Sequence, residues 1–149
     1  MEKFPEFELE NQDGEKVGNK DFEGKTVIYF YPKDNTPGCT TQACDLRDNM
    51  NHLNELGVKV YGVNGDSKRK HKNFIEKNNL NFDLLVDEDF KLAEALGVYR
   101  MKKVFGKESK GIVRTTFLVD EDGNILKRWD NVKAKDHIDE LKSHLEEEA

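Results

Sequence analysis

The sequence predicts an α/β fold in which a mixed central β-sheet carries helices on both faces, with a β-hairpin added at the N-terminus. Apolar runs typical of strands alternate along the chain with segments whose apolar residues recur at helical spacing. Residues 27–31 are apolar throughout, as in a central strand that is covered on both faces. Two strand-like runs follow one another near the C-terminus, which indicates that the sheet is mixed.

Length and charge limit the possible functions. The chain has 149 residues and no repeat or linker that divides it, so we expect a single domain over residues 1–149. The net charge of −6 argues against nucleic-acid binding, and the basic run at residues 68–72 is interpreted as the solvated first turn of a helix. No apolar run reaches the roughly twenty residues of a membrane span. The N-terminus has no signal or transit character, so we expect no membrane contact and a cytoplasmic location.

The first half of the chain predicts a hairpin, a buried strand and a long helix. Residues 7–17 form the hairpin around an Asp-Gly turn, and residues 25–31 form the buried strand. A turn with proline and glycine follows. The next helix ends at Gly57, and its inner side carries apolar residues at helical spacing, namely Ala43, Leu46, Met50 and Leu53.

The second half predicts two strands that are each followed by a helix. Residues 58–63 and 84–86 form the strands. Ser67 caps the helix after the first strand, and Asp87 caps the helix after the second, which ends near Gly97.

Residues 98–110 show no clear hydrophobic period and are rich in lysine and arginine, so we expect a mobile loop. This loop is either an ordinary surface loop or the wall of a pocket, to which it would contribute its apolar side chains, Val98, Met101, Val104 and Phe105. Residues 115–119 and 124–129 predict a hairpin, and residues 138–145 predict a closing helix. This order of elements resembles the thioredoxin fold with an N-terminal extension.

Both cysteines of the chain lie just after the buried strand. Cys39 stands where the long helix begins, and free N–H groups at a helix start stabilise a reactive thiolate. Cys39 faces the sheet and should be partly exposed, whereas Cys44 lies on the other, accessible side of the helix. Five positions on an intact helix separate two Cα atoms by roughly 8–9 Å, and a disulfide needs less than about 7 Å. The two sulfurs can therefore join only if the first turns of the helix unwind.

The residues alone leave several interpretations of this cysteine pair open. Two packed thiols would leave the proline-glycine turn unexplained, and a permanent disulfide would close a very short loop and suit an oxidising compartment. The cysteines and the four scattered histidines offer no zinc-ligand spacing, so we expect no metal. A redox-active pair accounts for every feature. A thiol-disulfide reductase is the nearest competitor, although its usual Cys-x-x-Cys spacing is absent and no proline lies near the strand at Thr115.

The segment 32–39 matches the peroxiredoxin signature Pro-x-x-x-Thr-x-x-Cys through Pro32, Thr36 and Cys39. The second cysteine, five residues further on, makes the chain similar to the bacterioferritin comigratory protein, or peroxiredoxin Q, subfamily. The resemblance extends over almost the whole chain and includes the segment 111–117. It implies a thioredoxin-fold peroxidase that uses thiols to reduce hydrogen peroxide and organic hydroperoxides.

By that resemblance Cys39 is the peroxidatic cysteine, and Cys44 is the resolving cysteine that forms an intramolecular disulfide with it. Thr36 would hydrogen-bond the thiolate and the peroxide, Pro32 would shield the pocket from water, and Arg114 would stabilise the thiolate. The resemblance also implies recycling by thioredoxin or a similar dithiol, a monomeric state, and no metal, flavin or haem cofactor.

The sequence departs from the subfamily pattern at two places. Gln42 stands where the subfamily often has glutamate, which bears on the orientation of Arg114, and Asn64 and Gly65 replace a more usual serine-containing pair. Two other functions compete with that of a peroxidase: a thiol-disulfide reductase, and a non-enzymatic redox-sensing module that binds a partner. Turnover of peroxide distinguishes the peroxidase from both.

Overall fold

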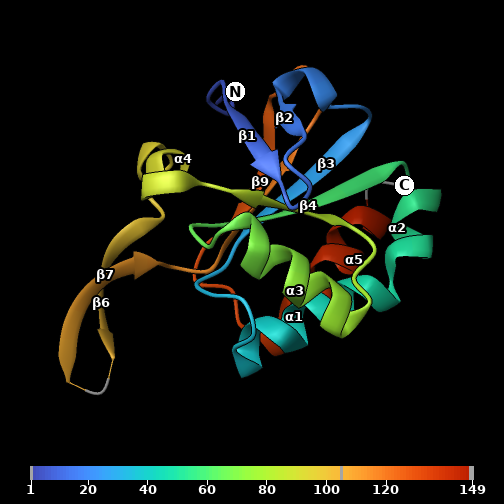
Figure 1. Cartoon of the computed structure of the whole chain (residues 1–149). Helices are drawn as coiled ribbons and strands as arrows, with labels where there is room; N and C mark the ends of the chain where they lie inside the picture. The colour runs from blue at the N-terminus through green and yellow to red at the C-terminus, as the bar shows by residue number, and fades with distance from the viewer. Residues whose placement is uncertain (1, 105, 148–149) are drawn as a thin grey trace.

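A seven-stranded mixed sheet with the order β2-β1-β5-β4-β3-β8-β9 runs through the molecule (Figure 1). The computed structural model describes residues 2–104 and 106–147. In the centre, β3 is parallel to β4, which is parallel to β5, while β8 runs antiparallel to both β3 and β9. These strands are β3 (Lys25–Phe30), β4 (Val58–Asn64), β5 (Asp83–Val86), β8 (Thr115–Val119) and β9 (Ile125–Trp129). The predicted α/β class and mixed sheet are confirmed.

The predicted N-terminal hairpin is also confirmed, and it extends the main sheet at one edge. Its strands are β1 (Glu8–Asn11) and β2 (Lys16–Gly18), and β1 pairs antiparallel with β5. The side chain of Asn11 closes the turn, because its Oδ1 accepts the backbone N–H groups of Asp13 and Glu15 at 2.9 and 3.0 Å. Gly14 has a φ of +81°, which glycine adopts without steric cost.

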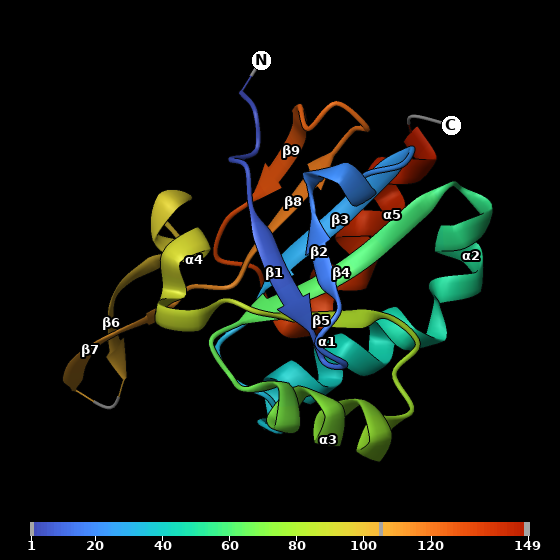
Figure 2. The ribbon, with the colours of Figure 1, turned by 45° about the horizontal axis from the view of Figure 1, so that its top comes forward.

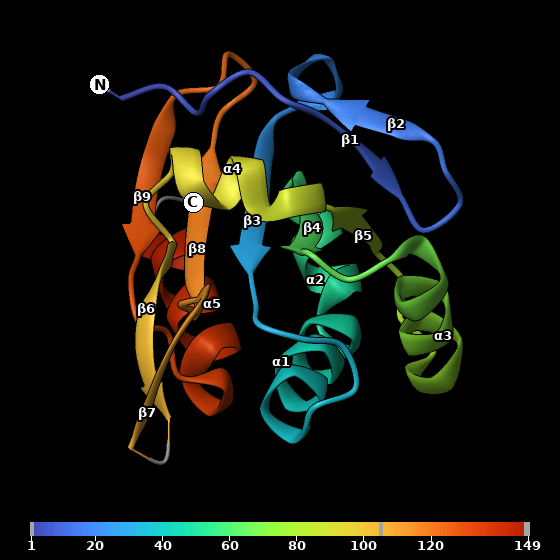
Figure 3. The same cartoon turned by 60° about the vertical axis from the view of Figure 1, so that its left-hand side comes forward.

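Four helices pack on one face of the sheet and one short helix packs on the other (Figure 3). The first group comprises α1 (Pro37–Asp48), α2 (Met50–Glu55), α3 (Lys68–Asn78) and α5 (His137–Glu147), and the opposite helix is α4 (Lys91–Ala95). Three short 3₁₀ segments, η1 (Asn19–Asp21), η2 (Glu88–Phe90) and η3 (Ala134–Asp136), connect the larger elements. Among the residues described, no helix is both long and apolar enough to cross a membrane.

Strand β3 divides the apolar core into two clusters, because successive side chains point to opposite faces of a sheet. Val27 and Tyr29 pack with the α1 and α5 helices, whereas Ile28 and Phe30 pack with α4 and the N-terminal segment. All four side chains are fully buried. The continuous apolar run of β3 is therefore explained by burial on both faces, as the sequence predicts.

The prediction of one long helix up to Gly57 is wrong at Asn49, where α1 ends and α2 begins. The side-chain amide of Asn49 donates to the carbonyl of Asp45 at 2.8 Å. The backbone N–H of Asn49 donates to the carbonyl of Leu46 at 3.1 Å instead of to that of Asp45. Asparagine can compete in this way with the backbone hydrogen bonds of a helix. Gly57 does end the second helix, with a φ of +76°.

The prediction of a mobile loop at residues 98–110 is wrong. The segment forms an antiparallel hairpin of β6 (Tyr99–Val104) and β7 (Lys107–Ile112), which projects from the body of the molecule in Figures 1 and 2. Most of its described side chains are exposed, so neither strand needs an apolar face and no alternation marks it in the sequence. Val98 is buried in the core and Met101 is 62% exposed, while Phe105 lies outside the described residues.

The prediction that Asp87 stands at the cap position of this helix is wrong, because α4 begins only at Lys91 and Phe90 precedes it, but the Asp87 side chain still reaches the start of the helix. Its buried carboxylate accepts the backbone N–H groups of Leu92 and Ala93 at 2.9 and 2.8 Å. Before the helix, Phe90 has a left-handed φ of +57° and lies over Gly65. A Cβ at position 65 would be only 2.5 Å from the Phe90 ring, which explains why a glycine stands there.

Candidate active site

The turn after β3 delivers the start of α1 to the edge of the sheet. The backbone N–H of Tyr31 donates to the carbonyl of Val63 at 3.2 Å, which extends the parallel pairing by one residue. Half-buried Pro32 follows, and Asn35 reverses the chain with a φ of +61°. Pro37 is the first residue of α1, a position where a missing N–H and a fixed φ are both suitable.

Thr36 is the residue that precedes the first turn of α1. Its carbonyl accepts the backbone N–H of Thr40 at 2.8 Å, and its hydroxyl donates to the carbonyl of Lys33 at 3.0 Å. The hydroxyl is thus directed back into the turn, and in the described part of the chain no hydrogen bond joins it to the sulfur of Cys39. A hydroxyl has one hydrogen to donate, so the predicted hydrogen bond from Thr36 to a thiolate would replace the bond to Lys33.

Cys39 lies in the first turn of α1, where the N–H groups have no partner within the helix. Its free thiol is only 1% exposed and packs with the rings beneath α1, so it is more deeply buried than we expect from the sequence. The hydroxyl of Tyr29 in this cluster is buried and has no hydrogen-bond partner among the described residues. Burial and then a negative charge on Cys39 raise the pKa of Tyr29 well above its usual range, so this hydroxyl keeps its hydrogen.

Cys44 is half-buried rather than freely accessible, because the end of α3 lies against it. Its sulfur is 3.9 Å from Oδ1 of Asn78, and both cysteines are free thiols. Helix α1 is continuous between the two cysteines. The expected separation of roughly 8–9 Å between their Cα atoms therefore applies to this conformation.

Arg114 lies against the first two turns of α1. Its Nη1 donates to Oε1 of Gln42 at 2.8 Å, and its guanidinium covers Gly38, where a Cβ would be 2.8 Å from Nη2. Gly38 is the residue before Cys39, and Gln42 is one helical turn further on. The structure thus brings Arg114 beside the cysteine turn, 72 positions along the chain from Gln42.

A chain of hydrogen bonds fixes Arg114 from behind. The side-chain amide of Gln42 donates to Nδ1 of His137 at 3.1 Å, and Nε2 of His137 donates to the hydroxyl of Thr116 at 2.8 Å. Burial, and then the positive charge of Arg114, lower the pKa of His137 to about 3, so the ring is neutral and Nδ1 accepts. The amide of Gln42 can accept from Arg114 and donate to this neutral histidine at once, which a carboxylate cannot do.

The depressed pKa of His137 predicts a loss of stability in mild acid. The unfolded chain binds a proton near pH 6.5, whereas the folded chain does so only near pH 3. The neutral ring of His137 therefore contributes fully to the free energy of unfolding above about pH 6.5. This contribution is lost as the pH falls, by about 1.4 kcal/mol per pH unit. Urea unfolding of the wild type and of His137→Asn, which retains an acceptor but does not titrate, measures it.

We expect the free energy of unfolding to fall more steeply between pH 6 and pH 4 in the wild type than in His137→Asn, because the carboxyl groups act alike in both. Identical slopes would contradict a neutral buried ring at position 137.

Lys102 is a second cation at this site that the sequence analysis misses. Its ammonium donates to the carbonyl of Ile112 at 2.7 Å, and its side chain lies over Gly111. Burial and then the nearby Arg114 lower the pKa of Lys102, while a negative charge on Cys39 acts in the opposite direction. Lys102 reaches this position only because residues 99–112 form a hairpin, which the hydrophobic pattern does not reveal.

The expectation of a solvated basic run at residues 68–72 is wrong for one of its members. Four of these side chains are exposed, but His71 is fully buried and lies 2.6 Å from the carboxylate of Asp34 in the cysteine turn. A histidine three positions before the buried Phe74 is the sequence signal that could have placed it on the inner side of α3.

The fold and the site together define a thioredoxin-fold protein with a buried cysteine at the start of a helix and an arginine beside it. The model of the AhpC/TSA family matches residues 1–128. Peroxiredoxin Bcp of Bacillus subtilis (strain 168) is 51% identical over 147 residues, which are 98% of this chain and 94% of that protein. Peroxiredoxin Bcp of Escherichia coli (strain K12) is 48% identical over 146 residues, which cover 97% of this chain and 94% of that protein.

Solved structures agree with these sequence relatives. The Xanthomonas campestris bacterioferritin comigratory protein, a structure described with its alkyl peroxide reduction activity, superposes with a TM-score of 0.88 at 35% identity. The match covers 95% of this chain and 91% of that one. The chain therefore belongs to the AhpC/TSA family, and it is a thiol-dependent peroxidase of the peroxiredoxin type. The thioredoxin fold and the resemblance to the bacterioferritin comigratory protein subfamily are confirmed.

Proposed function

We propose that Cys39 is the peroxidatic cysteine of this enzyme and that Cys44 resolves it as an intramolecular disulfide. The observation that carries this proposal is the position of Cys39, buried in the first turn of α1 with the guanidinium of Arg114 fixed over the preceding Gly38. Free helix N–H groups and a fixed cation both stabilise a thiolate and the charge that develops on the oxygens of an attacked peroxide.

The first step is a nucleophilic substitution at oxygen. The Cys39 thiolate attacks one peroxide oxygen, the O–O bond breaks, and hydroxide or alkoxide leaves with the electron pair and takes up a proton. Cys39 is oxidised to a sulfenic acid and the peroxide is reduced. Arg114 would stabilise the departing oxygen, Pro32 would exclude water from the thiolate, and Thr36 would donate to the reacting atoms instead of to Lys33.

The second step joins the two cysteines. The Cys44 sulfur attacks the sulfur of the Cys39 sulfenic acid, hydroxide leaves as water, and the S–S bond forms. Because α1 is intact between them, its first turns must unwind before the sulfurs can meet. An external dithiol, for which we propose thioredoxin, then reduces the disulfide by thiol exchange and is itself oxidised.

The substrates we propose are hydrogen peroxide and organic hydroperoxides. The structure of the Xanthomonas campestris relative is described with alkyl peroxide reduction, which supports the organic substrates. The oxidant is the substrate itself, so the cycle needs no metal, flavin or haem. We also propose that the chain acts as a single-domain, cytoplasmic monomer that binds neither nucleic acid nor membrane, in keeping with its net charge of −6 and its free thiols.

The intact mass of the reduced protein after one equivalent of hydrogen peroxide tests this function. The wild type should lose about two mass units, mapped to a Cys39–Cys44 peptide, because sulfenate formation and resolution remove two hydrogens in total. Cys44→Ser is the matched variant, and it should instead gain about sixteen mass units as the sulfenic acid. An unchanged mass of the wild type over minutes would overturn the peroxide reaction, and a gain of about sixteen mass units in the wild type without the loss of two would overturn the role of Cys44.

A further inference from the structure

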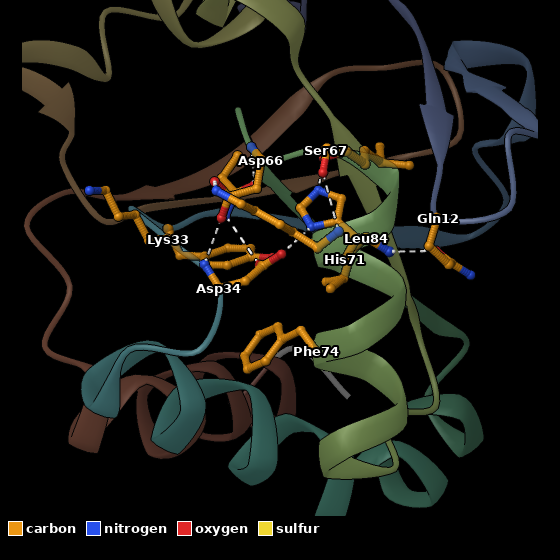
Figure 4. Close-up of polar contacts among 12 residues, drawn as sticks. Gln12, Lys33, Asp34, Asp66, Ser67, His71, Phe74 and Leu84 are labelled. Atoms are coloured by element: carbon orange, nitrogen blue, oxygen red, sulfur yellow. Dashed lines mark hydrogen bonds and ion pairs between the residues drawn. The ribbon is translucent and has the colours of Figure 1, made fainter.

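A buried carboxylate–imidazole pair joins the cysteine turn to α3 (Figure 4). Nδ1 of His71 lies 2.6 Å from Oδ2 of Asp34, and Nε2 donates to the carbonyl of Leu85 at 2.9 Å. His71 is completely buried and Asp34 is 8% exposed. A carbonyl only accepts, so Nε2 carries a hydrogen, and a second hydrogen lies between Nδ1 and the carboxylate. This interaction is a short, charge-assisted hydrogen bond that water does not screen.

Two further elements bind the same aspartate. The hydroxyl of Tyr31 at the end of β3 donates to Oδ1 at 2.6 Å, and Nδ2 of Asn64 at the end of β4 donates to it at 3.3 Å. The backbone N–H of Asp34 donates to Oδ2 of Asp66 at 2.8 Å. Burial and then the charge of Asp34 raise the pKa of Tyr31 well above its usual range, so this hydroxyl remains a donor. Asp34 is thereby fixed to two strands and one helix.

The other end of α3 lies against the second cysteine. The carbonyl of Asn78 accepts Nη1 of Arg47 at 2.7 Å, and its side-chain oxygen is 3.9 Å from the sulfur of Cys44. Helix α3 therefore contacts the chain before Cys39 through His71 and the chain around Cys44 through Asn78. The contact of α3 with Cys44 is much weaker than its contact with the cysteine turn. Cys44 makes a single weak thiol hydrogen bond, whereas Asp34 accepts three hydrogen bonds and donates one.

We propose that Asp34 and His71 are positioning residues that fix the chain just before Cys39 and confine the unwinding of α1 to the residues after Asp34. The inference rests on the function proposed above, in which α1 must open before Cys44 can reach Cys39. Because residues 31–34 stay fixed to the sheet, the unwound part of α1 refolds from the same position in the chain. Cys39 then returns to the same place beside Arg114. Loss of the Asp34–His71 pair would leave residues 31–34 less firmly held, so α1 would unwind more often in the reduced protein.

Amide hydrogen exchange in the reduced full-length protein tests the anchor without any peroxide chemistry. His71→Gln places an amide where Nε2 stands, which retains the bond to Leu85 but has no group opposite Asp34. His71→Asn places its amide where Nδ1 stands and retains the bond to Asp34. Ile75→Ala is the control for general destabilisation, because this half-buried residue of α3 packs on the core and belongs to no polar contact of the pair.

In His71→Gln we expect the amides of residues 40–44 to exchange at least about tenfold faster than in the wild type, since local opening governs their exchange. His71→Asn should stay within about threefold of the wild type, and Ile75→Ala should accelerate exchange in α3 more than in residues 40–44. If the amides of residues 40–44 exchange in His71→Gln at the same rate as in the wild type, the proposal is overturned. So would equal acceleration of these amides in His71→Gln and Ile75→Ala.

A kinetic readout separates this role from a merely structural one. His71→Gln should react more slowly with hydrogen peroxide than the wild type, yet convert its sulfenic acid to the disulfide faster, because an open α1 disfavours the first step and favours the second. A slowing of both steps would overturn the anchoring role. If the wild type does not react with peroxide at all, the proposed function fails, while hydrogen exchange still decides whether His71 fixes the turn.

Discussion

Cys39→Ser should lose peroxide consumption entirely, by a factor of at least about 10³, because the weakly acidic serine hydroxyl supplies almost no nucleophilic anion at neutral pH. Stopped-flow or competition kinetics with hydrogen peroxide measure this loss. The variant should also keep its mass unchanged after one equivalent of peroxide. Retained peroxide consumption in Cys39→Ser would place the reactive thiol elsewhere.

Two controls show whether the loss of activity comes from the missing sulfur of Cys39 or from a change in folding. Cys44→Ser makes the same atomic change five residues away and should keep the first reaction with peroxide. A serine hydroxyl at the buried position 39 costs about 1–3 kcal/mol if it finds no partner, so thermal unfolding has to show that the variant is folded at the assay temperature. Inactivity together with a folded chain assigns the chemistry to the Cys39 sulfur.

Arg114→Ala should slow the reaction of Cys39 with peroxide by about 10²–10³-fold, the usual effect of removing one fixed donor from a site of developing negative charge. The physical reason is the fixed place of the guanidinium, which lies over Gly38 and is oriented by Gln42. The second-order rate constant of thiol oxidation in a single turnover is the quantity to measure, because it contains no contribution from the reductant.

Three variants test the geometry as well as the charge. Arg114→Lys keeps the charge but cannot reproduce the planar fork, so its rate should lie between those of the wild type and Arg114→Ala. Gly38→Ala keeps Arg114 but puts a methyl group 2.8 Å from Nη2, which displaces the guanidinium and should slow the same step. Arg128→Ala removes an equal charge that is bound to Asp130, and it should not change the rate. An Arg114→Ala rate within threefold of the wild type would remove Arg114 from the mechanism.

The fold could be predicted well where burial imposes a pattern. The apolar run of β3 and the helical spacing of α1 follow from packing on the core, and both appear as predicted. The hairpin of β6 and β7 could not be predicted, because it projects into solvent and no buried face imposes alternation on it. The break between α1 and α2 at Asn49 was also not predicted, because it depends on one side chain that displaces a backbone hydrogen bond.

The site could be predicted only as far as local sequence defines it. The position of Cys39 at a helix start follows from the preceding Pro37 and Gly38, whereas the position of Arg114 beside it was expected only from a family resemblance. His71 illustrates the limit. It stands in a run of exposed cations, and only the tertiary structure shows that it alone turns inward to meet Asp34.

The continuous course of α1 through both cysteines also bears on the speed of the proposed cycle. Only residues 37–44, about two turns of helix, have to open and close in each round. Helix–coil relaxation takes about 0.1–1 μs, whereas enzymes typically turn over on the order of 1–10³ times per second. Rewinding of α1 is therefore faster than the cycle by a factor of about 10³ or more. Thiol chemistry and encounter with the reductant, rather than refolding of the helix, should set the rate at which one molecule clears peroxide.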